Sequence, residues 1–146
     1  MILDLLRHGE TEQGGGLRGR IDDALTARGW QQMRAAVPAA TPWQAVVSSP
    51  LQRCAAFAAE LAAQRGLPLH LEPGLREQTF GTMEGQLFAD LTALSPGAEH
   101  INEVRWGNGE SVADVHARLI ETFARIGIAP FKERVYADKQ RERAEA

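Results

Sequence analysis

The sequence is poor in cysteine, in aromatic residues and in long apolar runs. Aromatic residues make up 6% of its 146 residues, and its single cysteine, Cys54, cannot form an intrachain disulfide. A chain without disulfides is typical of a reducing compartment. No stretch approaches the roughly 20 consecutive apolar residues that span a bilayer, and the N-terminus lacks the pattern of a secretory signal. We therefore expect a cytoplasmic protein without a membrane partner.

The chain also lacks an excess of positive charge. Its 16 lysines and arginines against 19 acidic residues give a net charge of -3, which argues against nucleic acid or an anionic membrane as the main partner. Any anion site must then be a local group of arginines. The remaining composition is ordinary: 44% hydrophobic and 24% charged residues are typical of a folded domain, and the length suffices for one core.

The first strand that the sequence predicts ends in an unusual group of residues. An apolar run over residues 2–6, broken only by Asp4, is followed directly by Arg7, His8 and Gly9. In an open α/β sheet, ligands bind at the carboxyl ends of the strands. A cation, a titratable nucleophile and a glycine at such an end suit a bound phosphoryl group. A histidine after a strand is also commonly a structural loop residue, so the interpretation depends on residues later in the chain.

Apolar spacing and capping residues predict further helices and strands. In chain order we expect a helix begun by Thr26 and closed by Pro38, a strand at 45–48, a helix from a capping box at 49–52 to Gly66, an edge strand at 67–71, a short helix at 86–94, and a helix from a Ser111–Asp114 capping box to Gly127. Composition and periodicity alone thus indicate an α/β domain.

Three arginines lie where they could reach a ligand at the first strand end. Arg18 and Arg20 come after the glycines at 14–16, in a segment that is either a substrate loop or a flexible linker. Arg53 falls in the first turn of a predicted helix. There it either binds an anion together with the helix N-terminus or is a solvated surface residue. Beyond Pro130 the chain is mostly charged, and residues 132–146 are predicted to be a solvated helix or a frayed tail.

Four blocks of residues stand out along roughly residues 1 to 126: Leu6-Arg7-His8-Gly9-Glu10-Thr11; Leu25-Thr26-Ala27-Arg28-Gly29-Trp30-Gln31-Gln32; Ser48-Ser49-Pro50-Leu51-Gln52-Arg53-Cys54; and Leu75-Arg76-Glu77 with Phe80-Gly81 and Glu84-Gly85. In this order they resemble the signature of the histidine phosphatase superfamily, which has a phosphoglycerate mutase-like fold. The resemblance implies a three-layer α/β fold, with a mostly parallel central sheet flanked by helices.

Carried over residue by residue, the resemblance also implies a mechanism. His8 would become phosphohistidine, Arg7 and Arg53 would hold the phosphoryl oxygens, and Glu77 would protonate the leaving oxygen. Splitting the transfer into two steps lowers each barrier, and arginines complement the charge on the oxygens, so no metal or cofactor is required. Thr11 and Arg20 are expected to join Arg7 and Arg53 in binding a small phosphorylated metabolite.

Within the superfamily, the sequence is most similar to α-ribazole-5'-phosphate phosphatases of cobalamin synthesis. The segments that resemble theirs are Glu10-Thr11-Glu12 with the glycines after it, Gly19-Arg20-Ile21-Asp22, and Asn108-Gly109-Glu110-Ser111. The expected function is therefore a phosphomonoester hydrolase. Two alternatives stay open: a non-catalytic phosphate-binding or scaffolding domain, and a phosphoglycerate mutase-type phosphotransferase.

The sequence departs from the family at its C-terminal end. The family's second histidine, in a "V-x-x-H-G" block, has no counterpart, because no histidine occurs after His116. We expect an incomplete histidine phosphatase domain at 1–127, truncated before the last family strands, and a divergent tail at 128–146. Loss of one donor to the phosphoryl group would weaken activity by roughly 10² to 10³. An uncovered edge of the first strand would also permit a homodimer.

Overall fold

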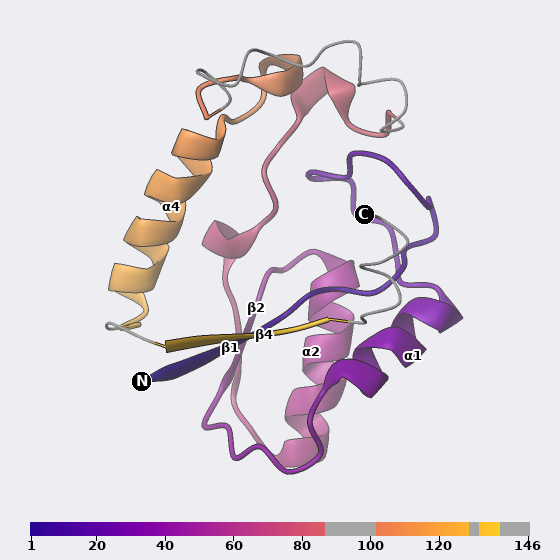
Figure 1. Cartoon of the computed structure of the whole chain (residues 1–146), viewed down its shortest axis with the longest axis vertical. Helices are drawn as coiled ribbons and strands as arrows, with labels where there is room; N and C mark the ends of the chain where they lie inside the picture. The colour runs from indigo at the N-terminus through magenta and orange to yellow at the C-terminus, as the bar shows by residue number, and fades with distance from the viewer. Residues whose placement is uncertain (87–101, 129–131, 138–146) are drawn as a thin grey trace.

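The computed structural model describes residues 1–86, 102–128 and 132–137, and it has the predicted mixed α/β architecture (Figure 1). In chain order the elements are β1 (Ile2–Leu6), α1 (Ala27–Ala36), β2 (Val46–Ser48), α2 (Gln52–Arg65), β3 (Leu69–Leu71), the short 3-10 turns η1 (Pro73–Leu75), η2 (Gly81–Met83) and η5 (Trp106–Asn108), α4 (Val112–Arg125) and β4 (Lys132–Tyr136). The predicted helix at 86–94 lies almost entirely outside the described residues.

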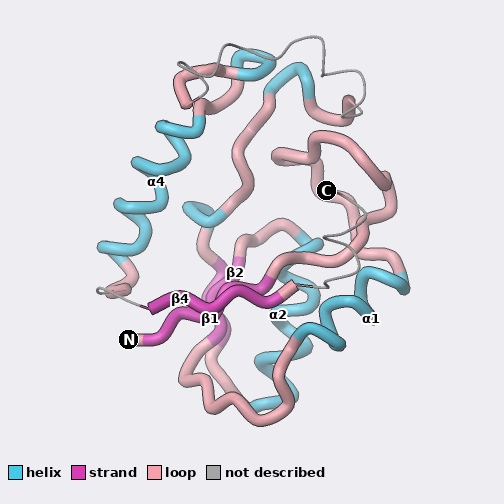
Figure 2. The backbone as a smooth tube through the Cα atoms, in the orientation of Figure 1, coloured by secondary structure: helices cyan, strands magenta, loops and turns pink. Residues whose placement is uncertain are grey.

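The strands pair in parallel, as the sequence predicts. β1 pairs with β4, and β2 pairs with β3. Within the described residues the strands therefore form two separate two-stranded sheets rather than one continuous sheet. β1 and β4 lie side by side across the front of the molecule in Figure 2.

β4 corrects one prediction. Residues 132–136 do not form the predicted solvated helix or frayed tail, because they pair with β1 in the register Ile2↔Lys132 to Leu6↔Tyr136. Arg134 lies opposite Asp4 and donates two hydrogen bonds to its carboxylate, at 2.5 and 2.8 Å. The positive charge of Arg134 thus forms an ion pair with Asp4 across the two strands. The edge of β1 on this side is covered, which removes part of the reason for expecting a homodimer there.

The core lies between α1, α2 and the end of β1. Its buried members are Leu25, Met33 and Phe57, and Leu6, Trp30, Val37 and Leu61 pack against them. The rings of Trp30 and Phe57 are tilted against each other with centroids 5.9 Å apart, a favourable aromatic arrangement. Thr26 caps α1 as predicted, accepting a hydrogen bond from the Gly29 N–H at 3.0 Å. This core fixes both helices beside the loop that comes after β1.

The start of α2 differs from the predicted capping box at 49–52. The helix begins at Gln52, and the Ser49 hydroxyl accepts from the Leu51 N–H instead of an N–H inside the helix. A carboxylate from elsewhere in the chain replaces it: Asp22 Oδ1 accepts from the Gln52 N–H at 2.7 Å. A negative charge is favourable at this end of the helix dipole. The predicted end at Gly66, in the left-handed region at φ 62°, is confirmed.

α4 stands apart from α1 and α2 (Figure 1). The predicted Ser111–Asp114 capping box is present, and Gly127 comes shortly after the helix at φ 78°. Only part of its apolar stripe is covered, because Val112 is 44% exposed. In the part of the chain that the structure describes, no helix combines the length and the apolar character needed to cross a membrane.

Candidate active site

The loop that carries His8 rests directly on the first turn of α1. A Cβ on Gly29 would lie 2.2 Å from the Glu10 carbonyl oxygen, and one on Gly9 would lie 2.2 Å from that of Gly29. Both positions therefore require glycine. The buried side chain of Gln32 completes the contact by accepting from the Glu10 N–H at 2.9 Å. These contacts explain the glycine and the second glutamine of the second sequence block.

His8 is held in one tautomer by its own loop. Its Nδ1 lies 2.8 Å from the Gly9 carbonyl oxygen. A carbonyl oxygen only accepts, so Nδ1 carries the proton in this contact, and in a neutral ring with this tautomer the lone pair is on Nε2. The ring is half-buried, whereas the neighbouring Arg7 is exposed. The Arg7 N–H donates to the Tyr136 carbonyl at 3.0 Å, which ties the strand end to β4.

Arg53 is a buried cation that donates hydrogen bonds to the loop at residues 18–22. It is 2% exposed, and its two terminal nitrogens donate to the carbonyls of Ile21, at 2.7 Å, and Gly19, at 2.9 Å. Its buried Nε–H finds no acceptor among the described residues. An unsatisfied buried donor is costly, more so on a charged group. Nε is thus the one guanidinium nitrogen of Arg53 without an acceptor among the described residues, while each terminal nitrogen donates to a carbonyl.

Glu77 lies close enough to the start of α2 for its charge to raise the pKa of the Cys54 thiol. Burial raises the pKa of the Cys54 thiol, the charge of Arg53 opposes that shift, and the charge of Glu77 adds to it. Arg53 and Glu77 are therefore both near the first turn of α2. The Glu77 side chain is exposed, and its Oε1 accepts from the Gln78 N–H at 2.8 Å. A carboxylate so placed is accessible to a ligand.

Thr11 and Arg20, the other predicted ligand residues, make contacts within the protein. Thr11 is buried, and its hydroxyl accepts from Arg18 Nε at 3.1 Å. Arg20 donates from Nε to the Glu77 carbonyl and from a terminal nitrogen to the Glu110 carboxylate, both at 3.3 Å. Arg20 thus lies beside Glu77. Thr11 connects the His8 loop, through Arg18, to the loop at residues 18–22 that Arg53 binds.

Residues 18–22 contact three of the predicted site residues, Thr11, Arg53 and Glu77. Arg53 binds carbonyls of this segment, Arg20 reaches from it to Glu77, and Arg18 connects it to Thr11. Glu84, from the fourth sequence block, also holds it, accepting from the Arg20 N–H at 2.9 Å. Among the described residues, no group of three or more histidine, cysteine or acidic side chains is placed to hold a metal ion.

Sequence reasoning did not single out Glu110 or Arg118. Glu110 stands just before α4 and receives hydrogen bonds from Arg118 at 2.9 and 3.1 Å. Burial of the Glu110 carboxyl pushes its pKa upward, but hydrogen bonds from Arg118 and the Thr79 N–H outweigh burial and lower it. The only signal in the sequence was the position of Glu110 in the Asn108-Gly109-Glu110-Ser111 segment, which says nothing of a partner at 118.

The fold and the site define a class: an α/β protein with a histidine at the end of its first strand and an arginine buried at the start of a helix. The family model of the histidine phosphatase superfamily (branch 1) matches residues 3–136. The chain belongs to this superfamily. The match extends through β4.

Curated relatives cover most of this chain but are longer. It is 35% identical over 126 residues to a glucosyl-3-phosphoglycerate phosphatase of Mycolicibacterium vanbaalenii, a match that spans 81% of this chain and 56% of that protein. It is also 35% identical over 128 residues to a bifunctional protein of Mycobacterium tuberculosis, spanning 79% of this chain and 34% of the relative. The chain thus spans about half or less of the length of these relatives.

Solved structures agree on the fold. The alpha-ribazole phosphatase from Shigella flexneri superposes with a TM-score of 0.69 at 26% identity, covering 93% of this chain and 73% of that one. A mycobacterial glucosyl-3-phosphoglycerate phosphatase superposes with a TM-score of 0.68 at 28% identity, covering 88% of this chain and 62% of that one. Both similar structures are phosphatases with different named substrates.

Proposed function

We propose that this protein is a phosphomonoester hydrolase that works through a phosphohistidine. The observation that carries the proposal is the buried guanidinium of Arg53, whose terminal nitrogens are fixed by two carbonyls and whose Nε–H has no acceptor among the described residues. A phosphoryl oxygen is a fitting acceptor for that donor. The phosphatases among the relatives and similar structures support the same chemistry.

The proposed reaction has two steps. His8 Nε2 attacks the phosphorus, the phosphorus–oxygen bond to the leaving group breaks, and Glu77 gives its proton to the departing oxygen. Water then attacks the phosphohistidine, with Glu77 accepting a proton, and inorganic phosphate leaves. Arg7 and Arg53 bind the non-bridging oxygens, on which the transition-state charge is spread. Because these arginines supply the positive charge, we propose that the reaction requires no metal ion.

For the substrate we propose a small phosphorylated metabolite. Two compounds are the first to compare because they appear in the names of similar proteins: α-ribazole 5'-phosphate, which the sequence blocks favour, and glucosyl-3-phosphoglycerate. The substrate is the compound with the higher kcat/KM, measured as release of inorganic phosphate from both under the same conditions. Equal and low values for both would point to another phosphomonoester.

His8→Ala tests the proposed function. We expect it to abolish the acid-labile, base-stable phosphoenzyme and to lower p-nitrophenyl phosphate turnover by at least about 10³-fold, since the nucleophile is lost. His116→Ala is the matched control, because His116 is exposed on α4; it should retain the wild-type rate. Wild-type turnover in His8→Ala would contradict the proposal.

A second candidate is a domain that binds phosphate compounds without hydrolysing them. It is favoured by the same Arg53 contacts, since two of the three guanidinium nitrogens are already used by Gly19 and Ile21. This alternative predicts binding of inorganic phosphate by calorimetry, lost in Arg53→Ala, together with no turnover of any phosphomonoester. Turnover that depends on His8 would exclude it.

A further inference from the structure

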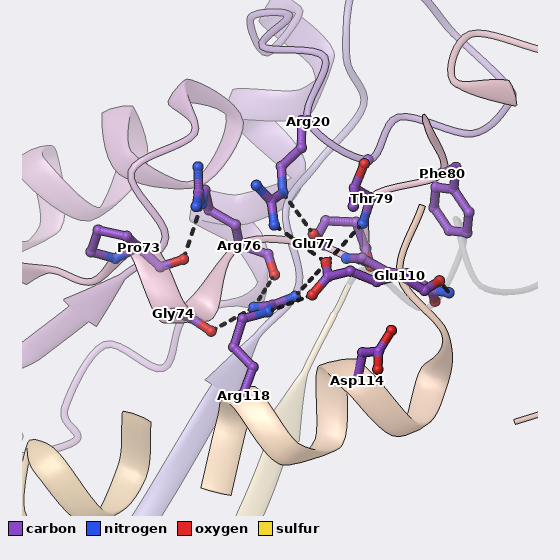
Figure 3. A network of polar contacts seen from close by, with 12 residues as sticks. Arg20, Pro73, Gly74, Arg76, Glu77, Thr79, Phe80, Glu110, Asp114 and Arg118 are labelled. Atoms are coloured by element: carbon purple, nitrogen blue, oxygen red, sulfur yellow. Dashed lines mark hydrogen bonds and ion pairs between the residues drawn. The ribbon is translucent and has the colours of Figure 1, made fainter. Parts of the chain in front are cut away.

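The segment that carries Glu77 has no helix or strand of its own to hold it. Glu77 lies between η1, which ends at Leu75, and η2, which begins at Gly81. Its backbone position must therefore come from contacts with other parts of the chain. The described contacts around it converge on two residues, Glu110 just before α4 and Arg118 within that helix (Figure 3).

Arg118 holds the backbone just before Glu77. One of its terminal nitrogens donates to the carbonyl of Gly74 at 2.6 Å and to that of Arg76 at 2.9 Å. Figure 3 shows the Arg118 side chain reaching from the α4 ribbon to both carbonyls. One side chain thus fixes two carbonyls within three residues of Glu77.

Glu110 holds the backbone just after Glu77. Its Oε1 accepts from the Thr79 N–H at 3.1 Å, and its main-chain carbonyl accepts from Gln78 Nε2 at 2.8 Å. Arg20 joins the same carboxylate to the Glu77 carbonyl, with 3.3 Å to each. The residues on both sides of Glu77, and its own carbonyl, are therefore tied to one carboxylate and its partners.

Glu110 and Arg118 act as one unit. The guanidinium of Arg118 makes two hydrogen bonds to the Glu110 carboxylate, and each side chain is 19% exposed. Such a fork is directional and largely shielded from solvent, so it holds its geometry better than an exposed pair. Loss of Glu110 would release the backbone after Glu77, and loss of Arg118 would release the backbone before it. In either case the remaining partner would keep its charge without its main counterion.

We infer that Glu110 and Arg118 are positioning residues for Glu77. The inference rests on the proposed function, in which Glu77 is the acid for the leaving oxygen. A general acid must come within hydrogen-bond reach of the atom it protonates, and a displacement of about 1 Å can cost about 10²-fold in rate. Neither side chain needs to contact the substrate to have this effect.

The test exploits the leaving group. p-Nitrophenolate leaves without much help from an acid, whereas an alkoxide requires protonation. In Glu110→Gln we expect kcat/KM, which reports the first step, to fall about 10- to 100-fold for an alkyl phosphate such as glycerol phosphate. For p-nitrophenyl phosphate it should fall only a few-fold, the same signature that Glu77→Gln should give. Arg118→Lys is the second variant, because it keeps the charge and removes the fork.

Glu60→Gln is the matched control. Arg34 also makes a two-fold hydrogen bond to the Glu60 carboxylate, at 3.1 and 2.8 Å, but this pair joins α1 and α2 and lies in the exposed surface. It should leave both substrates unaffected. Equal losses on both substrates in Glu110→Gln and Arg118→Lys, beyond those of the control, would overturn the positioning role, as would no loss on either.

A second readout does not depend on turnover. The charge of Glu77 contributes to the raised pKa of Cys54, so Glu77→Gln should lower the thiol pKa, measured from the pH dependence of alkylation. If Glu110 positions Glu77, Glu110→Gln should shift that pKa in the same direction. If the thiol pKa is lowered in Glu77→Gln but unchanged in Glu110→Gln, the inference is overturned. This measurement needs no turnover, so it tests the inference even if the wild-type protein is inactive and the proposed function has failed.

Discussion

At the scale of single residues, Gly29 sets how closely α1 approaches the His8 loop. A Cβ there would meet the Glu10 carbonyl oxygen at 2.2 Å and the Glu10 N at 2.9 Å, and backbone atoms cannot move aside as a flexible side chain can. The Gln32–Glu10 hydrogen bond depends on the same approach. The His8 loop can therefore lie this close to α1 only because residue 29 has no side chain.

We expect Gly29→Ala to lower the free energy of unfolding by about 1–3 kcal/mol, since overpacking forces the backbone apart. Turnover should fall with it, because the His8 ring moves with the loop. Urea unfolding and p-nitrophenyl phosphate turnover measure the two effects. Gly15→Ala is the control: a Cβ added there would have nothing within 4 Å, and it should change neither quantity appreciably. Equal stability of the two variants would contradict this explanation.

Residue-level signals in the sequence were reliable where the partner is local. The caps at Thr26 and Ser111 were predicted correctly, because a capping side chain bonds to an N–H only three residues along the chain. The cap at Ser49 was wrong, because the N-terminus of α2 takes its carboxylate from Asp22, 30 residues away in sequence. A local sequence pattern does not reveal a competitor at that distance.

At the scale of elements, β4 was missed for the same reason. Its five residues include lysine, glutamate and arginine, which favour solvent, and its stabilising partner Asp4 lies 130 residues earlier. The candidate site shows both cases. The sequence blocks include Thr11, Arg53 and Glu77, which contact residues 18–22. The network around Glu110 depends instead on contacts across α4, η1 and the segment before η2. Spacing along the chain carries no information about those.

The Asp4–Arg134 pair predicts how firmly β4 is attached. In a double-mutant cycle with Asp4→Asn and Arg134→Gln, we expect a small favourable coupling free energy, because these opposite charges face each other across the strands. Urea unfolding measures it. The side chain of Asp4 is 7% exposed but that of Arg134 is 43% exposed, so solvent screening keeps the value small. A coupling of zero would mean that pairing of the backbones alone holds the strand.

At the scale of the whole molecule, pairs of a carboxylate and an arginine involve residues in β1 and β4, in α1, α2 and α4, and in the loops between them. The pKa is lowered for Asp4, Asp23, Glu60, Glu72, Glu110 and Asp114. For Asp4, Glu60, Glu72 and Asp114 the leading cause of the lowered pKa is a hydrogen bond from an arginine. For Asp23 and Glu110 burial raises the pKa, but hydrogen bonds and arginine charges outweigh it.

These shifts predict loss of stability in acid. A folded-state pKa below the unfolded value means that the unfolded chain binds protons more readily, so the stabilisation is complete above about pH 4 to 5 and is lost as the pH falls through the lowered values. We expect the melting temperature to be nearly constant from about pH 7 to 5 and to fall steeply below about pH 4. Thermal unfolding followed by circular dichroism checks this. A melting temperature that rises as the solution is acidified further would contradict it.

The indole of Trp43 donates to the Asp4 carboxylate at 2.5 Å and lies under the guanidinium of Arg65, 4.4 Å from its ring centroid. Trp30 is partly buried: it packs on Phe57 at the edge of the core, and the Arg34 guanidinium lies 5.1 Å from its ring centroid. Two of the three tryptophans therefore lie in distinct surroundings. With Trp106 replaced by phenylalanine, emission from Trp43 would report the release of Asp4 and Arg134, and emission from Trp30 the melting of the helical pair, so spectroscopy could time the two events separately.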